Sequence, residues 1–353
     1  MAPNYAHWFA AESRTASLLP RAASDAEARR LFGLNGKGSG PVTQRDFVAA
    51  NQAKLNFDDI YTKDDPRDYF RVLGGLDYVI PDVARPIFRQ LIEARRAELG
   101  RPVTVLDIGC SYGINAALMC YPVTFETLYD RYLARGMQEL PASEIVELDR
   151  HFFASWPKRE DVRVIGMDIS GPAIEYAVAC DLLDFGIVGD FENGKPTREQ
   201  CAALKSVDII VSTGCVGYVT ERTFEKLAVC MEGVTPWVAS FVLRMFPYED
   251  IERTLAAQGL STERFEGTTF VQRRFGDRDE QRGVMEKLKA KGISPSGKEA
   301  DGHYHTELFV SRPKQAADKC PLQSMISVAA GLNRRYRTRV TRADHRRLKS
   351  KAG

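Results

Sequence analysis

The segment Val103-Thr-Val-Leu-Asp-Ile-Gly-Cys-Ser-Tyr-Gly113 decides the fold of this chain of 353 residues. Its first part is a short apolar run that ends at a glycine. Such a run is typical of a strand that is covered on both faces of its sheet. The bend from Gly109 to Gly113 allows a ligand to approach the backbone closely. Because open α/β sheets bind ligands at the carboxyl ends of their strands, the segment predicts a binding site at this bend.

Outward from this segment, strand-like runs alternate with helical stretches. The further strand-like runs are 162–167, 187–189, 207–212, 237–245, 268–275 and 307–311. The helical stretches between and after them are 172–184, 197–205, 221–232, 248–258 and 278–291. This alternation predicts a parallel, doubly wound sheet with helices on both faces. The last two strand-like runs close the domain, with a helix between them. This order suggests a sheet edge that contains both parallel and antiparallel strands.

The chain divides into three predicted regions. Residues 1–100 form an N-terminal helical lid region, with helices expected at 43–55, near Tyr69 to Leu73 and at 81–99, and a loop at 56–66. Residues 101–313 form the α/β domain, which contains a helical insertion at 121–161 near the mouth of the site. Residues 314–353 form a basic, flexible tail, in which residues 333–353 hold nine Lys or Arg and one Asp.

Composition limits the possible classes of protein. The chain is 44% hydrophobic and 27% charged, as soluble globular proteins are, and it has no apolar run long enough to span a bilayer. Its first 30 residues lack the layout of a secretory signal, so we expect a cytoplasmic protein without a membrane partner. Seven scattered cysteines without a C-x-x-C pair argue against a disulfide framework and a structural zinc site, and most are expected to be reduced core residues.

Three acidic residues stand at the ends of three successive predicted strands. They are Asp107, Asp168 and Asp190, the last followed by Phe191. A carboxylate at such a position can accept hydrogen bonds from both hydroxyls of a ribose, and another can accept from an adenine amino group. Any one of these acids could instead be a helix cap or a solvated loop residue. All three together, after a glycine bend, predict a nucleoside site.

Segments 105–113, 166–170 and 189–191 resemble the class I S-adenosylmethionine (SAM)-dependent methyltransferase superfamily. The resemblance covers about residues 100–313. It implies a doubly wound, seven-stranded Rossmann-like sheet with an antiparallel edge strand, and SAM as the cofactor. The turn from Asp107 to Gly113 would hold the amino-acid part of SAM, Asp168 would bind the ribose, and Asp190 would meet adenine. The residues that the resemblance implies as SAM contacts are Asp107, Gly109, Cys110, Ser111, Gly113, Asp168, Ile169, Asp190, Phe191, Ser212 and Thr213.

The sulfonium of SAM already activates its methyl group, so the protein must align a nucleophile and exclude water. The candidates for a catalytic role are Tyr78, Tyr112, Asn115, Tyr218 and His303. A tyrosine ring can stabilise a sulfonium by cation–π contact, although each of these tyrosines could equally be a packing residue. His303 is a candidate general base. His303 and His305 alone make an incomplete ligand set, so no metal site is predicted.

The acceptor is expected to be a small molecule, and nucleic acid is not expected. The segment 212–218 lacks the Asn/Asp-Pro-Pro-aromatic signature of enzymes that methylate bases or glutamine. Two alternatives stay open: a SAM-consuming cyclase or aminocarboxypropyl transferase that releases methylthioadenosine, and a non-catalytic SAM- or RNA-binding module that uses the basic tail. A dinucleotide enzyme fits poorly. Its ribose-binding acid follows the glycine motif by about 20 residues, whereas Asp168 follows Asp107 by 61 residues. The sequence leaves the oligomeric state open.

Overall fold

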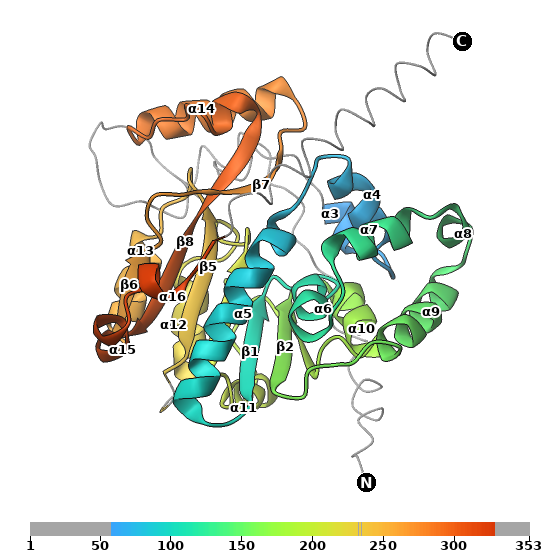
Figure 1. The fold of residues 1–353 in the computed structure, drawn as a ribbon, viewed down its shortest axis with the longest axis horizontal. Coiled ribbons are helices and arrows are strands. Elements are labelled where there is room, and N and C mark those ends of the chain that lie inside the picture. The colour runs from blue at the N-terminus through green and yellow to red at the C-terminus, as the bar shows by residue number, and fades with distance from the viewer. Residues whose placement is uncertain (1–57, 232, 234, 329–353) are drawn as a thin grey trace, which may run out of the picture. The chain divides into compact units, whose positions relative to one another are not determined.

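A central eight-stranded sheet organises the described residues of this computed structural model, which are 58–231, 233 and 235–328 (Figure 1). The strands are β1 (Val103–Ile108), β2 (Val162–Asp168), β3 (Phe185–Val188), β4 (Ile209–Thr213), β5 (Trp237–Leu243), β6 (Leu260–Arg264), β7 (Phe270–Arg274) and β8 (His303–Pro313). Their order is β3-β2-β1-β4-β5-β8-β6, and β7 also pairs with β8. Strands β1 to β5 are parallel, whereas β8 is antiparallel to β5, β6 and β7.

The predicted doubly wound sheet with a mixed edge is therefore confirmed, with one strand more than expected. The additional strand is accommodated because β8 is 11 residues long and pairs with β7 along 303–306 and with β6 along 309–313. The sequence analysis missed β6, Leu-Ser-Thr-Glu-Arg, because it is an edge strand with a single apolar residue. Polar edge strands of this kind avoid pairing with other chains but give no apolar signal.

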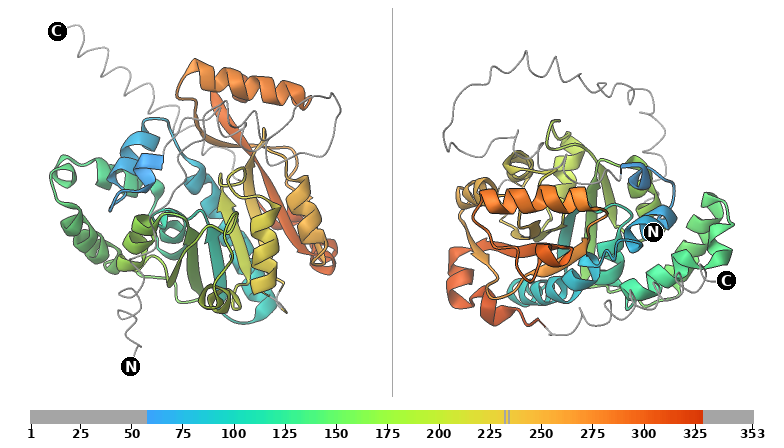
Figure 2. Two further views of the ribbon diagram at one scale, coloured as in Figure 1. Left: turned by 180° about the vertical axis from the view of Figure 1, so that it is seen from behind. Right: turned by 90° about the horizontal axis from the view of Figure 1, so that it is seen from above.

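Helices cover both faces of the sheet, as the two views of Figure 2 show. The first face carries α4 (Arg67–Gly74), α5 (Ile80–Leu99), α6 (Ile114–Cys120), α7 (Phe125–Leu133) and α10 (Gly171–Ala179). The second carries α11 (Arg198–Leu204), α12 (Glu221–Cys230), α13 (Glu249–Ala256) and α14 (Arg278–Ala290). Each set packs on its own apolar cluster. In β1, for example, Val105 belongs to the first cluster and Leu106 to the second, because successive side chains of a strand point to opposite faces.

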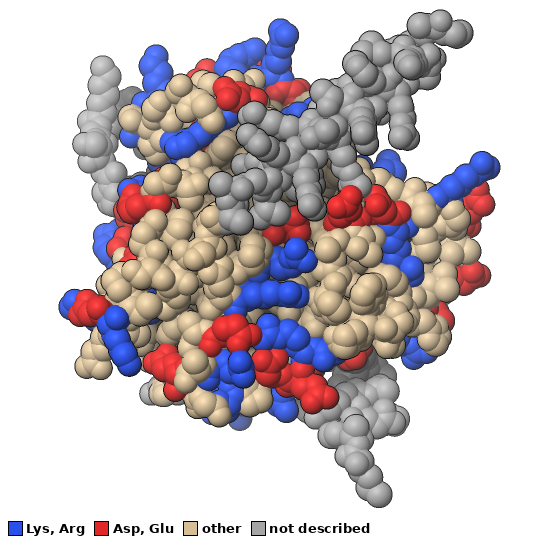
Figure 3. All heavy atoms as spheres, in the orientation of Figure 1, with Lys and Arg blue, Asp and Glu red and all other residues tan. Residues whose placement is uncertain are grey.

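Helix α5 lies across the first face and agrees with the prediction at 81–99. Pro81 occupies its first turn, where the missing N–H costs nothing, and Gly100 ends the helix in the left-handed conformation with φ 66°. On the face shown in Figure 3, acidic and basic side chains are interspersed. Arg96 of α5 pairs with both Glu93 and Asp161.

Residues 121–161 are largely helical, in agreement with the expected insertion. They contain α7, α8 (Arg135–Gln138) and α9 (Ala142–Ala154). Asp149 is fully buried in this region and accepts hydrogen bonds from Arg131, Tyr132 and Tyr176 at 2.7 to 3.0 Å. This buried polar cluster joins α7, α9 and α10, so the insertion is bound firmly to the main domain.

Two sequence expectations differ from the structure. The predicted loop at 56–66 contains a one-turn helix, α3 (Asp58–Tyr61), which is too short for a periodic signal. The first part of the predicted flexible tail forms α15 (Lys314–Lys319) and α16 (Leu322–Met325), which are anchored by the buried Leu322. Five of the seven cysteines are free, in line with the expectation that most are reduced, whereas Cys201 and Cys230 form a disulfide between α11 and α12. The predicted helix at 43–55 and the basic residues 333–353 lie outside the described residues.

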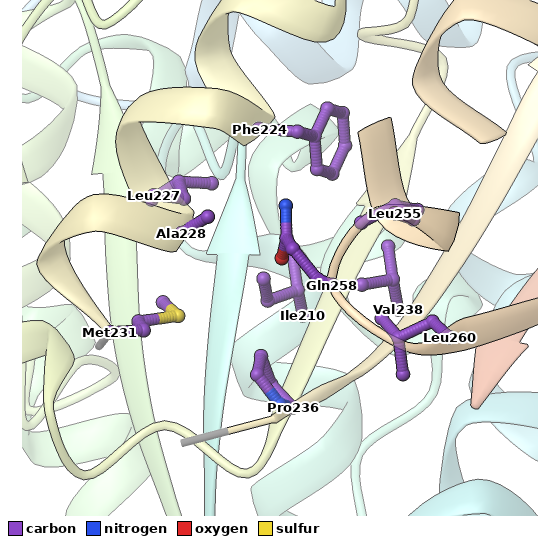
Figure 4. Close-up of a pocket in the computed structure, with 10 residues that line it drawn as sticks. All are labelled: Ile210, Phe224, Leu227, Ala228, Met231, Pro236, Val238, Leu255, Gln258 and Leu260. Atoms are coloured by element: carbon purple, nitrogen blue, oxygen red, sulfur yellow. The ribbon is translucent and has the colours of Figure 1, made fainter. Parts of the chain in front are cut away.

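An apolar pocket lies at the end of the sheet opposite the glycine bend. It is formed where α12 and α13 meet the starts of β4 and β5, and Phe224, Leu255 and Val238 are among its lining residues (Figure 4). Its volume of about 10 Å³ would hold roughly one water molecule. The pocket is therefore a packing defect and not a substrate site. None of the described helices is both long and apolar enough to cross a membrane.

Candidate functional site

The glycine bend after β1 has an unusual backbone, as its sequence predicts. Gly109, Ser111 and Gly113 have φ values of 69°, 49° and 72°. A Cβ atom at Gly109 would lie 2.9 Å from Cβ of Cys215, so only glycine fits there. Ser111 is the exception, because a residue with a side chain rarely adopts a positive φ. Its backbone N–H donates to Oδ2 of Asp168 at 2.9 Å, which helps to hold this conformation.

Asp107 lies at the end of β1 and is completely buried. Its Oδ1 accepts a hydrogen bond from Nδ2 of Asn115 at 3.1 Å, and the same amide nitrogen lies 3.1 Å from Oγ1 of Thr213. Burial raises the pKa of Asp107 to about 7, and Asn115 opposes this rise. The ends of β1 and β4 and the start of α6 therefore meet in one buried polar cluster.

Asp168 connects the two loops of the predicted site. Its Oδ2 accepts from the backbone of Ser111, and its Oδ1 accepts from the backbone N–H of Ser170 at 2.9 Å. Burial raises the pKa of Asp168, and these two backbone donors lower it in part. Each oxygen of a carboxylate can accept more than one hydrogen bond, so Asp168 can still receive the hydroxyls of a ligand. Next to it, the side chain of Ile169 is 75% exposed.

Several polar atoms of this cluster have no hydrogen-bond partner in the described structure. They are Oδ2 of Asp107, Oγ of Ser111 and Oδ1 of Asn115, and all three are shielded from solvent. Leaving such atoms unpaired costs free energy, so their gathering at one strand end indicates a place built for a polar ligand. Two of the three are acceptor oxygens, which suit a ligand that carries N–H donors. The cluster therefore suits a ligand that carries an amino group.

The third predicted acid is held differently. Asp190 is exposed, and its Oδ1 accepts from the backbone N–H groups of Glu192 and Asn193 at 2.9 and 3.0 Å. Phe191 is buried in the second apolar cluster. Glu192 binds the start of α12 through Thr220, at 2.6 Å between Oε1 and Oγ1. This turn is thus rigid, and the roles of Asp190 and Phe191 toward adenine stay a prediction.

Three tyrosines outside the glycine bend lie close enough to the acidic cluster to feel its charges. The rings of Tyr61 and Tyr78 both lie edge-on to Tyr69, at centroid distances of 6.1 and 6.0 Å. Burial raises the pKa of all three phenols, and the charge of Asp107 raises the pKa of Tyr69 and Tyr78 further. Their proximity to the acids makes these rings a wall of the candidate site.

The remaining catalytic candidates occupy different places. Tyr112 is fully buried, and its hydroxyl lies 2.8 Å from O of Ile60 and 2.9 Å from O of Lys63. That hydroxyl is therefore engaged by the backbone. Tyr218 is 54% exposed, in the loop between β4 and α12. His303 is half-buried at the start of β8, opposite Arg274 of β7.

The sequence analysis did not single out Cys215 and Gln272, which both contact glycines of the site. Cys215 packs against Gly109, and a Cβ atom at Gly214 would lie 2.1 Å from Nε2 of Gln272. Oε1 of Gln272 is buried and has no hydrogen-bond partner in the described structure. Gln272 comes from β7, 59 positions after Thr213, and only the pairing of β7 with β8 brings it to the site. No local sequence pattern could have revealed that contact.

Metal ligands are not grouped in the part of the chain that the structure describes: no three His, Cys, Asp or Glu side chains are placed to hold an ion there. His305 lies near His303, and its Nδ1 is 3.0 Å from Oγ1 of Thr269. Burial lowers the pKa of His305 to about 4, so the ring is neutral at ordinary pH. The absence of a metal site from the whole protein stays a prediction.

Comparisons with known proteins gave matches among solved structures alone. No protein-family model and no curated protein sequence matches the chain. The plantazolicin methyltransferase BamL, solved with a desmethylPZN analogue and SAH, has a TM-score of 0.37 and 13% identity, over 76% of this chain and 97% of its own. A TehB-like SAM-dependent methyltransferase from Corynebacterium glutamicum has a TM-score of 0.30 and 16% identity, over 62% and 87%. The bifunctional kinase-methyltransferase WbdD has a TM-score of 0.31 and 16% identity, over 64% and 40%.

A likeness at this level carries no argument about substrate or reaction. The assignment of the fold rests on the chain itself: five parallel strands with β1 at the centre, an antiparallel strand beside β5, and a glycine bend after β1. Together with an acid at the end of β2, these features agree with the Rossmann-like sheet with an antiparallel edge that the sequence predicted.

Proposed function

We propose that this protein binds SAM at the carboxyl ends of β1, β2 and β4 and transfers its methyl group to a small-molecule acceptor. The observation that carries the proposal is the group of unpartnered polar atoms on Asp107, Ser111 and Asn115, which lies beside the glycine bend. A buried acid with a free acceptor oxygen is suited to an ammonium group, because a charge-assisted hydrogen bond forms there without competition from water.

Each part of the site has a distinct task in this proposal. Asn115 orients Asp107, which would receive the α-ammonium group of SAM. Asp168 would accept the ribose hydroxyls while it holds the bend through Ser111. When bound, SAM supplies a methyl group on a positively charged sulfur, which needs no further activation. The chain's own contribution is then to position the two reactants and to exclude water.

The walls of the site support a small acceptor. Tyr61, Tyr69 and Tyr78 pack together near the acidic cluster, where their rings would exclude water and present weakly negative faces to a sulfonium. Gln272 adds a buried carbonyl oxygen that could accept a hydrogen bond from an acceptor's N–H or O–H group. These groups suit an acceptor that is small enough to be enclosed.

Two measurements test the proposal. Calorimetry should detect binding of S-adenosylhomocysteine to the full-length protein, and absence of binding would refute the SAM site. Incubation with SAM and a panel of amines, carboxylic acids and phenols, followed by mass spectrometry, should give S-adenosylhomocysteine and an acceptor heavier by one methylene unit. Release of methylthioadenosine would instead identify a cyclase or an aminocarboxypropyl transferase. Binding without turnover of any acceptor would favour a non-catalytic module.

A further inference from the structure

One short segment receives hydrogen bonds from both loops of the candidate cofactor site. The hydroxyl of Tyr112, in the glycine bend, lies within hydrogen-bonding distance of the backbone carbonyls of Ile60 and Lys63, at 2.8 and 2.9 Å. Oγ of Ser170, in the loop after β2, donates to the backbone carbonyl of Tyr61. The two loops that would bind SAM thus place two hydroxyl donors against the carbonyls of this segment, and the single proton of Tyr112 is shared between Ile60 and Lys63.

These contacts determine where the segment lies. Helix α3 has one turn, and such a helix leaves its last carbonyls without partners and is not stable by itself. The hydroxyls of Tyr112 and Ser170 supply the missing donors. The segment places Tyr61 beside the wall of aromatic rings, where the charge of Asp168 contributes to the raised pKa of its phenol, after burial and two nearby tyrosines.

The insertion supports this segment from the other side. Arg67 binds Asp65 through two nitrogens at 2.8 Å, and its Nη1 donates to the carbonyls of Met137 and Leu140 at 2.9 and 2.7 Å. One arginine therefore ties the end of the segment to the connection between α8 and α9. The segment lies between the cofactor loops and the insertion.

Helix α4 completes the support. The ring of Phe70 stacks on Tyr132 of α7 with a centroid distance of 4.6 Å and an interplanar angle of 17°. Gly74 packs so closely against Tyr129 that a Cβ atom there would lie 2.0 Å from its ring. Helices α4 and α7 thus form one packed body, which does not depend on the hydrogen bonds of Tyr112 to stay together.

From these contacts we propose that residues 58–65 form a cover over the cofactor site, held shut by Tyr112 and Ser170, and that SAM and its by-product exchange only when these hydrogen bonds break. The inference rests on the proposed function, and it gives the insertion the task of carrying the cover. Tyr112 and Ser170 are positioning residues, because they act through the segment and not on the reacting atoms.

We call the hydrogen bonds of Tyr112 and Ser170 to residues 58–65 the latch. This latch can open without unfolding of the domain. It consists of neutral hydrogen bonds to a single helical turn, and such local contacts break far more often than a whole core unfolds. Removing the hydroxyl of Tyr112 should therefore raise the frequency of opening. Since one neutral hydrogen bond has a modest net contribution to stability, an increase of about fivefold is expected.

The test uses S-adenosylhomocysteine as the probe and stopped-flow kinetics with the full-length protein. In Tyr112→Phe, the association and dissociation rate constants should both rise about fivefold, while Kd changes less than about twofold, because opening precedes both steps. The matched control is Tyr121→Phe. Tyr121 is also buried, and its hydroxyl donates to the backbone carbonyl of Asp181 at 3.0 Å, outside the cover. Its rates should equal those of the wild type.

The outcomes separate a latch from a merely structural contact. If Tyr112→Phe lowers the melting temperature and leaves both rate constants unchanged, the proposal is overturned. The same holds if Tyr121→Phe accelerates exchange equally, because the effect would then be a general loosening of the fold.

A second measurement covers the case in which the variant folds poorly or the probe does not bind. Hydrogen exchange of the wild-type protein should show the amides of 58–65 protected by S-adenosylhomocysteine, while those of the α5 core at 87–92 stay unchanged. Failure of the wild type to bind the probe would refute the proposed function. The latch would still be tested, because without ligand the amides of 58–65 should exchange faster in Tyr112→Phe than in the wild type. Equal exchange would overturn it.

Discussion

Nδ2 of Asn115 lies 3.1 Å from Oδ1 of Asp107, and the second carboxylate oxygen of Asp107 meets no donor from the residues that the structure describes. The arrangement fixes an anionic group by one neutral donor and keeps its other oxygen for a ligand. A purely structural buried acid would have donors on both oxygens, as Asp149 does.

Asp107→Asn should weaken the binding of S-adenosylhomocysteine by about tenfold to a hundredfold, because the charged partner of the ammonium group is lost while the size of the side chain is kept. Calorimetry measures the change. Asp181→Asn is the control, since Asp181 is exposed, has a φ of 59° that asparagine tolerates, and should bind the probe as the wild type does. Equal affinities of the two variants would contradict the role of Asp107.

The pH dependence of stability should carry the signature of Asp107. Its pKa is about 7 in the folded protein, against 3.8 as its ordinary value, so folding takes up a proton between these limits. The contribution of this group to the free energy of unfolding should therefore increase as the pH falls from about 7 to about 4. Denaturant unfolding without ligand, compared between wild type and Asp107→Asn, isolates it. Parallel pH profiles of the two proteins would show that Asp107 is ionised throughout.

Asp168→Ala should reduce the affinity for S-adenosylhomocysteine by about a hundredfold while the protein stays folded, because the partner of the ribose hydroxyls disappears. The change also frees the backbone N–H groups of Ser111 and Ser170, so a modest decrease in melting temperature should accompany it. Asp168→Asn keeps one acceptor oxygen, so its affinity for S-adenosylhomocysteine should lie between those of the wild type and Asp168→Ala. Calorimetry and thermal unfolding report the two effects, and unchanged affinity in Asp168→Ala would remove this residue from the site.

Asp149→Ala should destabilise the protein by about 3 kcal/mol, because it leaves Arg131 and two buried tyrosine hydroxyls without their acceptor. Chemical denaturation measures the loss. Glu147→Gln, on the exposed side of the same helix, removes only surface ion pairs with Arg150 and His151 and should leave stability nearly unchanged. A small effect of Asp149→Ala would mean that the insertion is not anchored through this cluster.

The sequence was most informative where a local pattern has one physical explanation. The apolar run 103–108 and the glycines at 109 and 113 predicted β1 and its bend correctly, because burial on both faces and a positive φ each select a narrow set of residues. Helix α5 was found because its apolar residues recur at helical spacing. The same reasoning failed for α3 and β6, which are too short or too polar to show a period.

The side-chain contacts of the site were predictable only in part. Asp107 and Asp168 could be placed from the ends of strands, and the structure joins Asp107 to Asn115 of α6 and Asp168 to the glycine bend. The approach of Gln272 to Gly214 depends on the pairing of β7 with β8, and no sequence period records such pairing. Tyr112 was expected to face the reaction, yet its hydroxyl binds the backbone of a segment about 50 positions earlier.

The tyrosine at position 112 makes the glycine bend and residues 58–65 depend on each other, although they lie far apart in the sequence. A homologue that replaces Tyr112 with a smaller residue would leave the carbonyls of Ile60 and Lys63 without their donor, and so would tolerate a different conformation or length at 58–65. In related sequences, a change in the glycine bend should therefore coincide with a change in the segment before α4. A tyrosine at 112 should coincide with a conserved length of chain between them.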